Sequence, residues 1–146
     1  MKTGILKELY RYPVKKEPAV QEESLILEAG AGICGDCHKD GGERQVALLT
    51  VTEKQWMEQQ DVQGFCFHKY KENLLLDGCS LADLHPGDRL RIGSAVLEIT
   101  GGVKGCYPKL CRQASVREKC MLAGCSMFAV VRESGVIEKG MEVTFR

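Results

Sequence analysis

The sequence lacks an excess of charge of either sign. Lysine and arginine together number 20, and aspartate and glutamate also number 20, so the formal net charge is zero. A chain without a net field does not collect nucleic acid or an anionic membrane surface. We therefore expect neither nucleic acid nor a membrane as a partner.

Long apolar runs are also missing. No stretch approaches the roughly eighteen apolar residues that a membrane-spanning helix needs. The first eight residues, MKTGILKE, contain no apolar core of signal-peptide length and include an acid. These absences predict a cytoplasmic protein.

Low-complexity segments, internal repeats and linkers are absent as well, so we expect residues 1–146 to form a single domain. A chain of this length can bury roughly two thirds of its unfolded surface. With 44% hydrophobic and 27% charged residues, the composition is that of a globular domain and excludes a disordered tail.

Short strands dominate the patterning. Residues 89–92 alternate arginine with apolar residues, Gly93-Ser94 suits a two-residue hairpin turn, and residues 96–99 return as the partner strand. Residues 141–145 alternate in the same way after a turn at Lys139-Gly140. Continuous apolar runs at 46–51 and 127–131 have strand length and suit buried positions.

Helical signals are fewer. Residues 52–60 begin with Thr52-Glu53-Lys54-Gln55, a capping-box pattern, and residues 80–83 predict one helical turn before Pro86-Gly87. Residues 110–122 are compatible with a helix or a loop. The fold class predicted is mainly β (α+β), a β-barrel or sandwich with a few short helices.

Eight cysteines in 146 residues are the unusual feature of the composition. In a chain without an export signal they are metal ligands, reactive thiols or small buried hydrophobes. Cys66 and Cys79 lie among apolar neighbours, which favours the buried role for both. The other six form two groups.

The first group is Cys34-Gly35-Asp36-Cys37-His38. It matches the C-x-x-C-H pattern of c-type haem attachment, but that reaction requires export to an oxidising compartment. A zinc knuckle from Cys34, Cys37, His38 and one distant thiol is chemically reasonable, because two thiolates at this spacing can hold one metal. The alternative is a glycine-rich turn that presents Asp36 and His38 to a site.

The second group is Cys106-x4-Cys111-x8-Cys120-x4-Cys125. Its spacing permits a structural zinc site but is wider than the usual zinc hooks. Redox or sulfur-handling chemistry and buried packing remain the alternatives.

A glycine-rich segment, Gly101-Gly102-Val103-Lys104-Gly105, leads into the first thiol of that second group, Cys106. Glycines free the backbone to turn its amides toward an anion, and Lys104 places a positive charge two residues before the thiol. A neighbouring cation favours the thiolate, which attacks sulfur or binds a soft metal. An exposed hairpin end with a lysine is the alternative interpretation.

Seven short motifs follow one another along the chain. Three are Gly35-Asp36-Cys37-His38, Arg44-Gln45-Val46-Ala47-Leu48-Leu49 and Tyr70-Lys71-Glu72-Asn73-Leu74, and the others occupy residues 86–93, 95–100, 104–106 and 135–140. In this order they resemble the MOSC domain, the C-terminal module of molybdenum cofactor sulfurases. The resemblance spans residues 13–145 and is that of a small stand-alone member.

The resemblance implies a β-barrel-like fold and a protein that binds or serves the molybdenum–pterin cofactor. Family members hold molybdenum through a cysteine, which corresponds to Cys106, or carry sulfur on it for metal–sulfur centres. Lys104 and His38 would assist that cysteine, and Cys111 or Cys120 could resolve a persulfide. Residues that would bind the cofactor are Asp36, Arg44, Glu72, Asn73 and Gly102. Pyridoxal phosphate is not expected on this chain.

Two functional hypotheses follow. In the first, the chain is a sulfur transferase or a component of a molybdenum-dependent reductase, with a cysteine desulfurase or cofactor-biosynthesis proteins as partners. In the second, it is a non-catalytic interaction module in cofactor synthesis or delivery, or a structural zinc-binding domain. The sequence departs from small relatives in its extra thiols, Cys34 and Cys37, and in Ala123-Gly124-Cys125-Ser126, where those relatives carry an arginine.

Overall fold

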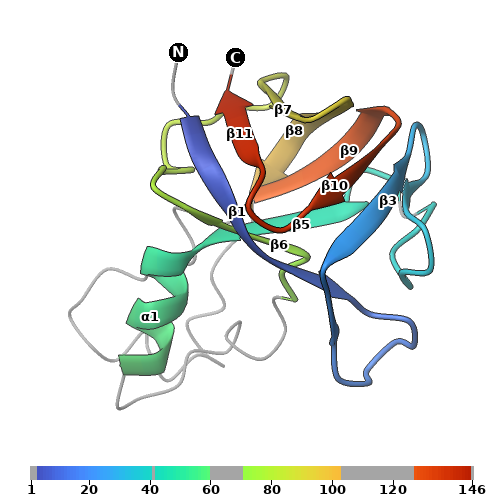
Figure 1. Ribbon diagram of the computed structural model, residues 1–146, viewed down its shortest axis with the longest axis horizontal. Helices are drawn as coiled ribbons and strands as arrows, with labels where there is room; N and C mark the ends of the chain where they lie inside the picture. Colours follow the sequence, from blue (N-terminus) through green and yellow to red (C-terminus); the bar gives the residue numbers. More distant parts are fainter. Residues whose placement is uncertain (1–2, 41, 60–70, 103–126, 146) are drawn as a thin grey trace, which may run out of the picture.

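The computed structural model describes residues 3–40, 42–59, 71–102 and 127–145. Strands make up most of this part of the chain (Figure 1). The elements are β1 (Thr3–Arg11), β2 (Val20–Glu22), β3 (Ser24–Glu28), β4 (Gly32–Ile33), β5 (Val46–Thr50), α1 (Val51–Gln59), β6 (Leu74–Asp77), β7 (Arg89–Ile92), β8 (Ala95–Gly102), β9 (Met127–Glu133), β10 (Gly135–Glu138) and β11 (Glu142–Phe145).

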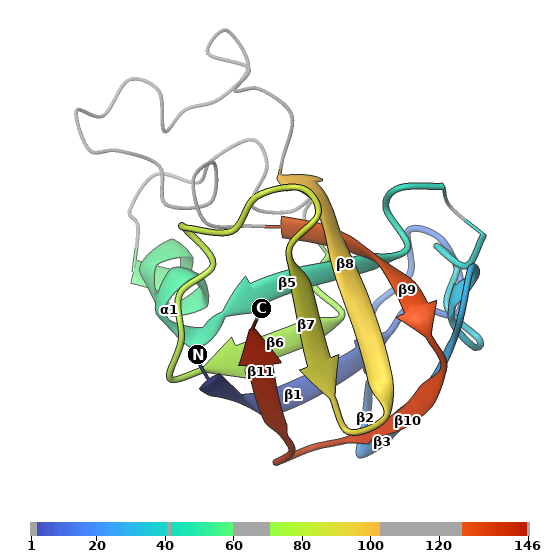
Figure 2. The ribbon, with the colours of Figure 1, turned by 90° about the horizontal axis from the view of Figure 1, so that it is seen from above.

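Seven of these strands close into a barrel (Figure 2). The order is β11-β7-β8-β9-β5-β6-β1, and β1 then pairs with β11 to complete the ring. All neighbouring barrel strands are antiparallel except β5 and β6, which are parallel. The β-rich, barrel-like fold class predicted from the sequence is confirmed.

The barrel encloses a core of aliphatic side chains. Strands that face solvent on one side alternate inward apolar residues with outward polar ones, as β7 does with Leu90 and Ile92. The inward residues join one buried cluster, whose members from seven barrel strands include Leu6, Leu48, Leu76, Leu90, Leu97, Val131 and Val143.

A second, three-stranded sheet of order β10-β3-β4 lies beside the barrel (Figure 1). The buried side chains of β3, Leu25 and Leu27, join the barrel core together with Ile33 and Ile137. This small sheet therefore seals one side of the barrel. It also delivers the chain after β4 to the site described below.

Helix α1 follows β5 without an intervening loop. It packs with Val51 and Met57 against the outward residues of the parallel pair, Ala47, Leu49 and Leu75. Both sides of β5 are thus covered, which is why its five residues are all buried and read as a continuous apolar run.

The predicted capping box at Thr52 is wrong. The helix already begins at Val51, so Thr52 lies within its first turn and Thr50 takes the preceding position. Among the described residues, the buried hydroxyl of Thr50 and one buried carboxylate oxygen of Glu53 have no hydrogen-bonding partner. The helix starts early because the last residue of β5 leads straight into it.

The predicted hairpin and strands are confirmed, but the helical turn predicted at residues 80–83 is not. The hairpin of β7 and β8 turns at Gly93-Ser94, where Gly93 has the left-handed φ of 60° that such tight turns require. Strands β5, β9 and β11 lie where the apolar runs and the alternation predicted them. Residues 80–83 form a hydrogen-bonded turn, with the Ala82 amide donating to Ser80 Oγ, rather than a turn of helix.

Cys79 packs against the core cluster as a half-buried thiol, in agreement with the buried role expected for it. Cys66 and residues 110–122 lie outside the described residues. Within the described part of the chain, α1 falls short of the length and apolar character that a membrane crossing would require.

Candidate functional site

The candidate site begins with the turn that follows β4. The Asp36 amide donates to Ile33 O at 3.2 Å, and the Cys37 amide donates to Tyr12 O at 2.7 Å, which ties this turn to the end of β1. Gly35 has a φ of 80°, and a Cβ there would lie 3.0 Å from Nη1 of Arg11. Only glycine fits the turn without strain or displacement of Arg11.

Asp36 is the buried centre of the turn. Its side chain has no exposed surface, and its carboxylate accepts four hydrogen bonds. Oδ1 accepts from the Tyr12 amide at 2.8 Å and from Asn73 Nδ2 at 3.1 Å. Oδ2 accepts from the His38 amide at 2.9 Å and from His38 Nδ1 at 3.0 Å.

Burial alone would raise the pKa of Asp36, but the hydrogen bonds from His38 and from the Tyr12 amide outweigh it. The pKa of this carboxyl therefore lies below its ordinary value, and Asp36 is ionised at neutral pH.

His38 is held in one tautomer by this carboxylate. A carboxylate oxygen only accepts, so Nδ1 carries the proton that it donates to Asp36, and Nε2 bears a lone pair. The side chain is 39% exposed, so that a ligand or substrate can reach Nε2. The imidazole is thereby set up as a proton acceptor or a metal ligand.

The Cys37 thiol lies beside this imidazole. Its Sγ is 3.7 Å from Nδ1 and 4.0 Å from Nε2 of His38. Burial and the charge of Asp36 raise the pKa of Cys37, so the thiol is protonated at neutral pH. Its neighbour Cys34 is not part of the group, because the Cys34 thiol donates to Glu28 Oε2 at 3.6 Å.

The zinc knuckle considered as an alternative needs Cys34, Cys37, His38 and one distant thiol, and among the described residues Cys34 bonds to Glu28 and lies outside the cluster. The potential metal ligands that come together among the described residues are Asp36, Cys37 and His38, with one ligand atom of each within 4.8 Å of the others.

Asn73, the residue before β6, connects the turn to the barrel. Its Nδ2 donates to Asp36 Oδ1 and to Tyr10 O at 3.2 Å, and its Oδ1 accepts from the Ala47 amide at 2.9 Å. Both the NH₂ group and the oxygen of the side chain are hydrogen-bonded, and the residue is 1% exposed. Asn73 thus fixes β1, β5 and the Asp36 turn in one arrangement.

Glu72 precedes Asn73 and anchors the nearby helix. Lys54 Nζ, on α1, donates to Glu72 Oε1 at 2.9 Å and to the Tyr10 hydroxyl at 3.2 Å. Burial lowers the pKa of Lys54, but the bond to Glu72 more than offsets it, and the net shift is upward. The Tyr12 hydroxyl donates to Glu72 O at 3.0 Å.

Two predicted residues lie apart from this network. The Arg44 guanidinium stacks on the Phe128 ring, 4.8 Å from its centroid. Gly102 ends β8, where it pairs with Met127 of β9. The remaining predicted site residues, Cys106, Lys104, Cys111 and Cys120, lie outside the described residues.

Tyr12 and Lys54 were not foreseen from the sequence. Tyr12 contacts residues 24 and 60 positions away, and Lys54 bonds to residues 44 and 18 positions away. Both look locally like ordinary polar ends of elements, so no pattern within a short window could identify them.

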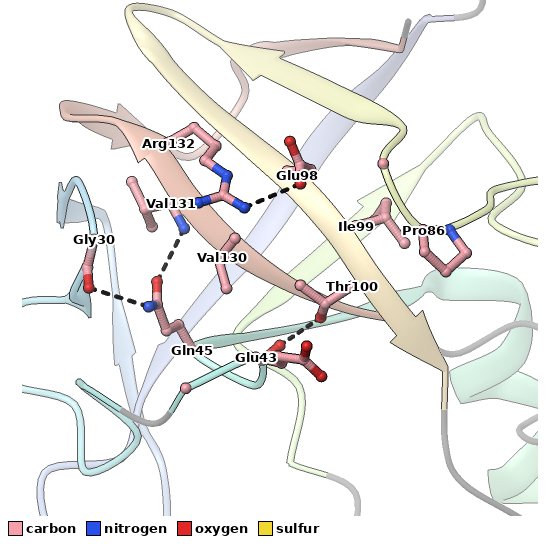
Figure 3. A pocket seen from close by; sticks show the side chains of 12 residues that line it. Gly30, Glu43, Gln45, Pro86, Glu98, Ile99, Thr100, Val130, Val131 and Arg132 are labelled. Carbon is pink, nitrogen blue, oxygen red and sulfur yellow. Dashed lines mark hydrogen bonds and ion pairs between the residues drawn. The ribbon is translucent and has the colours of Figure 1, made fainter.

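A separate hollow of about 410 Å³ lies over β8 and β9 (Figure 3). Most polar side chains in its wall bond within the wall: Gln45 Nε2 donates to Gly30 O at 3.3 Å, the Val131 amide donates to Gln45 Oε1 at 3.0 Å, Thr100 Oγ1 donates to Glu43 O, and Arg132 Nη2 donates to Glu98 Oε2 at 3.1 Å. Two of these bonds fasten Gln45 to β9 and Glu43 to β8. The hollow is accordingly a weaker candidate than the Asp36 turn.

Comparison with known structures supports the fold. The YuaD protein from Bacillus subtilis is similar with a TM-score of 0.73 and 21% identity, over 97% of this chain and 94% of that one. YiiM from Escherichia coli gives a TM-score of 0.61 and 17% identity, over 100% of this chain and 70% of that one. YiiM from Geobacillus stearothermophilus gives 0.58 and 16%, over 99% and 75%.

No curated protein matches the chain. A family model does: the one described as the MOSC domain matches residues 35–144, a span that includes the Asp36 turn, Glu72 and Asn73. The resemblance seen in the order of the sequence motifs is thereby confirmed, and this chain belongs to the MOSC domain family.

Proposed function

We propose that this MOSC domain handles the molybdenum–pterin cofactor, or sulfur destined for it, on the thiol of Cys106. MOSC domains are associated with molybdenum-cofactor-related proteins, and the family match over residues 35–144 is the observation that carries the proposal. The Asp36–His38 pair would be the acid–base and orienting partner of that thiol.

The strand register supports a meeting of Cys106 with the Asp36 turn. Gly102 pairs with Met127, Met127 with Leu48, and Leu48 with Leu74, the residue after Asn73. Three strand spacings amount to about 14 Å along the sheet. Four residues of fully extended chain also span up to about 14 Å, so the number of residues between Gly102 and Cys106 is compatible with a thiol near Leu74, the neighbour of Asn73.

The described residues fit a bound cofactor in part. Asp36 and Asn73 have committed their polar atoms to each other and to the backbone, so they would support the site rather than touch the ligand. His38 Nε2 and Lys71 remain available. The Lys71 ammonium lies 5.5 Å from the centroid of the Tyr12 ring and makes no ion pair among the described residues.

Each residue then has a defined task. Lys71 would neutralise the phosphate of the pterin, with Lys104 as a second cation, and Arg44 could contribute only by leaving the Phe128 ring. The Cys106 thiolate would be the soft protein ligand of molybdenum, which supplies the redox chemistry when bound. His38 would accept or return a proton at Nε2, because Asp36 keeps the proton on Nδ1.

As a sulfur carrier the same thiol would act by exchange. The Cys106 thiolate attacks the outer sulfur of a donor persulfide, such as that of a cysteine desulfurase. A new S–S bond forms, the donor's S–S bond breaks, and the donor leaves as a thiolate. Attack by Cys111 or Cys120 on the inner sulfur would then release hydrosulfide and leave a disulfide.

The test is elemental and persulfide analysis of protein purified anaerobically from its native host. Molybdenum near one per chain, lost in Cys106→Ala but kept in Cys34→Ala, would establish cofactor binding. Persulfide without molybdenum, with the same dependence on Cys106, would establish the sulfur carrier. Neither species on the wild-type protein would overturn the proposal and favour an interaction module.

A further inference from the structure

The Asp36 turn contains a thiol that the proposed function does not use. Cys37 lies between the two residues of the Asp36–His38 pair, and its sulfur is 4.0 Å from His38 Nε2. We propose that Cys37 Sγ and His38 Nε2 together bind a divalent cation of the zinc class, with Asp36 holding the imidazole from behind. This site goes beyond the Cys106 chemistry, and because His38 Nε2 has one lone pair, the imidazole holds the cation only when it is not serving Cys106 as a base.

The imidazole is already prepared as a ligand. Metal-bound histidines commonly donate their second ring N–H to a carboxylate, which fixes the tautomer and the ring orientation. His38 Nδ1 makes this bond to Asp36 Oδ2 at 3.0 Å. The Nε2 lone pair then points away from the buried carboxylate, on a side chain that is 39% exposed.

A shared metal requires the Cys37 sulfur to move away from Nδ1, to which it is now nearer than to Nε2. Zinc binds sulfur at about 2.3 Å and nitrogen at about 2.05 Å, in tetrahedral geometry. Two such ligands are about 3.6 Å apart, compared with 4.0 Å between Sγ and Nε2. Since Sγ is also 3.7 Å from Nδ1, binding requires the Cys37 side chain to rotate toward Nε2.

Asp36 does not act as a third ligand. Both of its oxygens already accept two hydrogen bonds, and a metal on either would displace the Tyr12 amide, Asn73 or His38. Its role is to position His38. Water or a small anion completes the coordination, so the site is open.

The ligand set selects the metal. A thiolate and an imidazole suit zinc and its softer relatives, whereas calcium and magnesium prefer oxygen donors. The free site lacks a thiolate, and a metal generates one because it displaces the proton of a thiol as it binds. We therefore expect zinc, and cobalt as its spectroscopic substitute, to bind while magnesium does not.

The experiment measures alkylation of individual cysteines in the folded, reduced full-length chain, with and without zinc, by peptide mapping. Zinc should slow alkylation of Cys37 by about tenfold or more and leave Cys34 unchanged. Cys34 is a control within the same molecule, three residues away. Magnesium serves as the control cation.

The variants His38→Ala and His38→Gln should both lose the protection of Cys37, and circular dichroism establishes that each is folded. Cobalt titration of Cys37→Ser should lack one equivalent of thiolate–cobalt absorption that Cys34→Ser retains. Unchanged Cys37 alkylation in zinc, or equal protection in the folded His38 variants, would overturn the proposal. Neither result bears on molybdenum or persulfide at Cys106.

Discussion

Replacement of Asp36 by asparagine tests how much the buried carboxylate contributes to the fold. The substitution keeps the size and shape of the side chain but turns one acceptor oxygen into an NH₂ donor. The carboxylate receives four hydrogen bonds, two at each oxygen, and all four come from N–H groups. One oxygen therefore keeps its partners, and the other is replaced by a group that repels them.

The cost follows from this arrangement. The asparagine oxygen can still accept from the Tyr12 amide and from Asn73, so its NH₂ group faces the amide and Nδ1 of His38. His38 can move its ring proton to Nε2 and so relieve one of the two contacts. A buried donor left unpaired costs about 1–3 kcal/mol, and the loss of charge-assisted bonds adds about 1 kcal/mol. We expect Asp36→Asn to lower the free energy of unfolding by about 2–4 kcal/mol.

Urea unfolding at neutral pH under reducing conditions, followed by circular dichroism, measures this change. Asp40→Asn is the matched control: Asp40 is exposed, and its left-handed φ of 64° suits asparagine at least as well. It should change the free energy of unfolding by less than about 0.5 kcal/mol. If Asp36→Asn also falls within that margin, the four hydrogen bonds do not carry the role assigned to them.

The difference in unfolding free energy between the wild-type protein and Asp36→Asn should depend on pH. The pKa of Asp36 is lower in the folded protein than its ordinary value, so the unfolded chain binds a proton more readily. The carboxylate's contribution is complete above the ordinary value of 3.8 and is lost as pH falls through the folded pKa. The difference between the wild-type protein and Asp36→Asn should accordingly shrink as unfolding is repeated from pH 6 down to about pH 3.

Three further predictions concern the barrel and its edges. Gly135→Ala should destabilise the fold by about 1–3 kcal/mol in urea unfolding, since its Cβ would lie 2.7 Å from a backbone nitrogen. Gly101→Ala is the control and should not destabilise the fold, because a Cβ there has nothing within 4 Å; equal effects of the two substitutions would contradict this reasoning. Burial raises the pKa of Cys79 to about 11, so iodoacetamide should label it at pH 8 at least about a hundredfold more slowly in the native than in the unfolded protein. Lys54→Met should lower the free energy of unfolding by about 1–3 kcal/mol, because it leaves the nearly buried Glu72 unpaired. The double variant Lys54→Met with Glu72→Gln should recover part of this loss, and additive losses would show that the pair does not interact.

Local patterns were enough for those elements whose signals are confined to a few residues. The β7–β8 hairpin followed from alternation and Gly93-Ser94, and both are visible within a dozen residues. Strand β1 escaped detection because its pairing with β6 shifts register between Leu6 and Glu8. This irregularity puts its buried leucines, Leu6 and Leu9, three positions apart, which is not the period of a strand.

The candidate site could be predicted only as a set of residues, not as an arrangement. Family resemblance identified Asp36, His38 and Asn73, and the structure brings the three together. It does not follow from the sequence that Asp36 and Asn73 bond to each other, because they are 37 positions apart. Tyr12, whose amide completes the carboxylate's set of donors, carries no local signal at all.

The closure of the barrel by β1 and β11 has a consequence for biosynthesis. Thr3 pairs with Thr144, so the ring joins residues that lie 141 positions apart in the chain. Until residue 145 has left the ribosome, β1 and β7 each retain an edge without its β11 partner, and such edges readily pair with other chains. We therefore expect nascent chains truncated before Glu142 to aggregate or recruit chaperones, whereas chains that include β11 close the barrel.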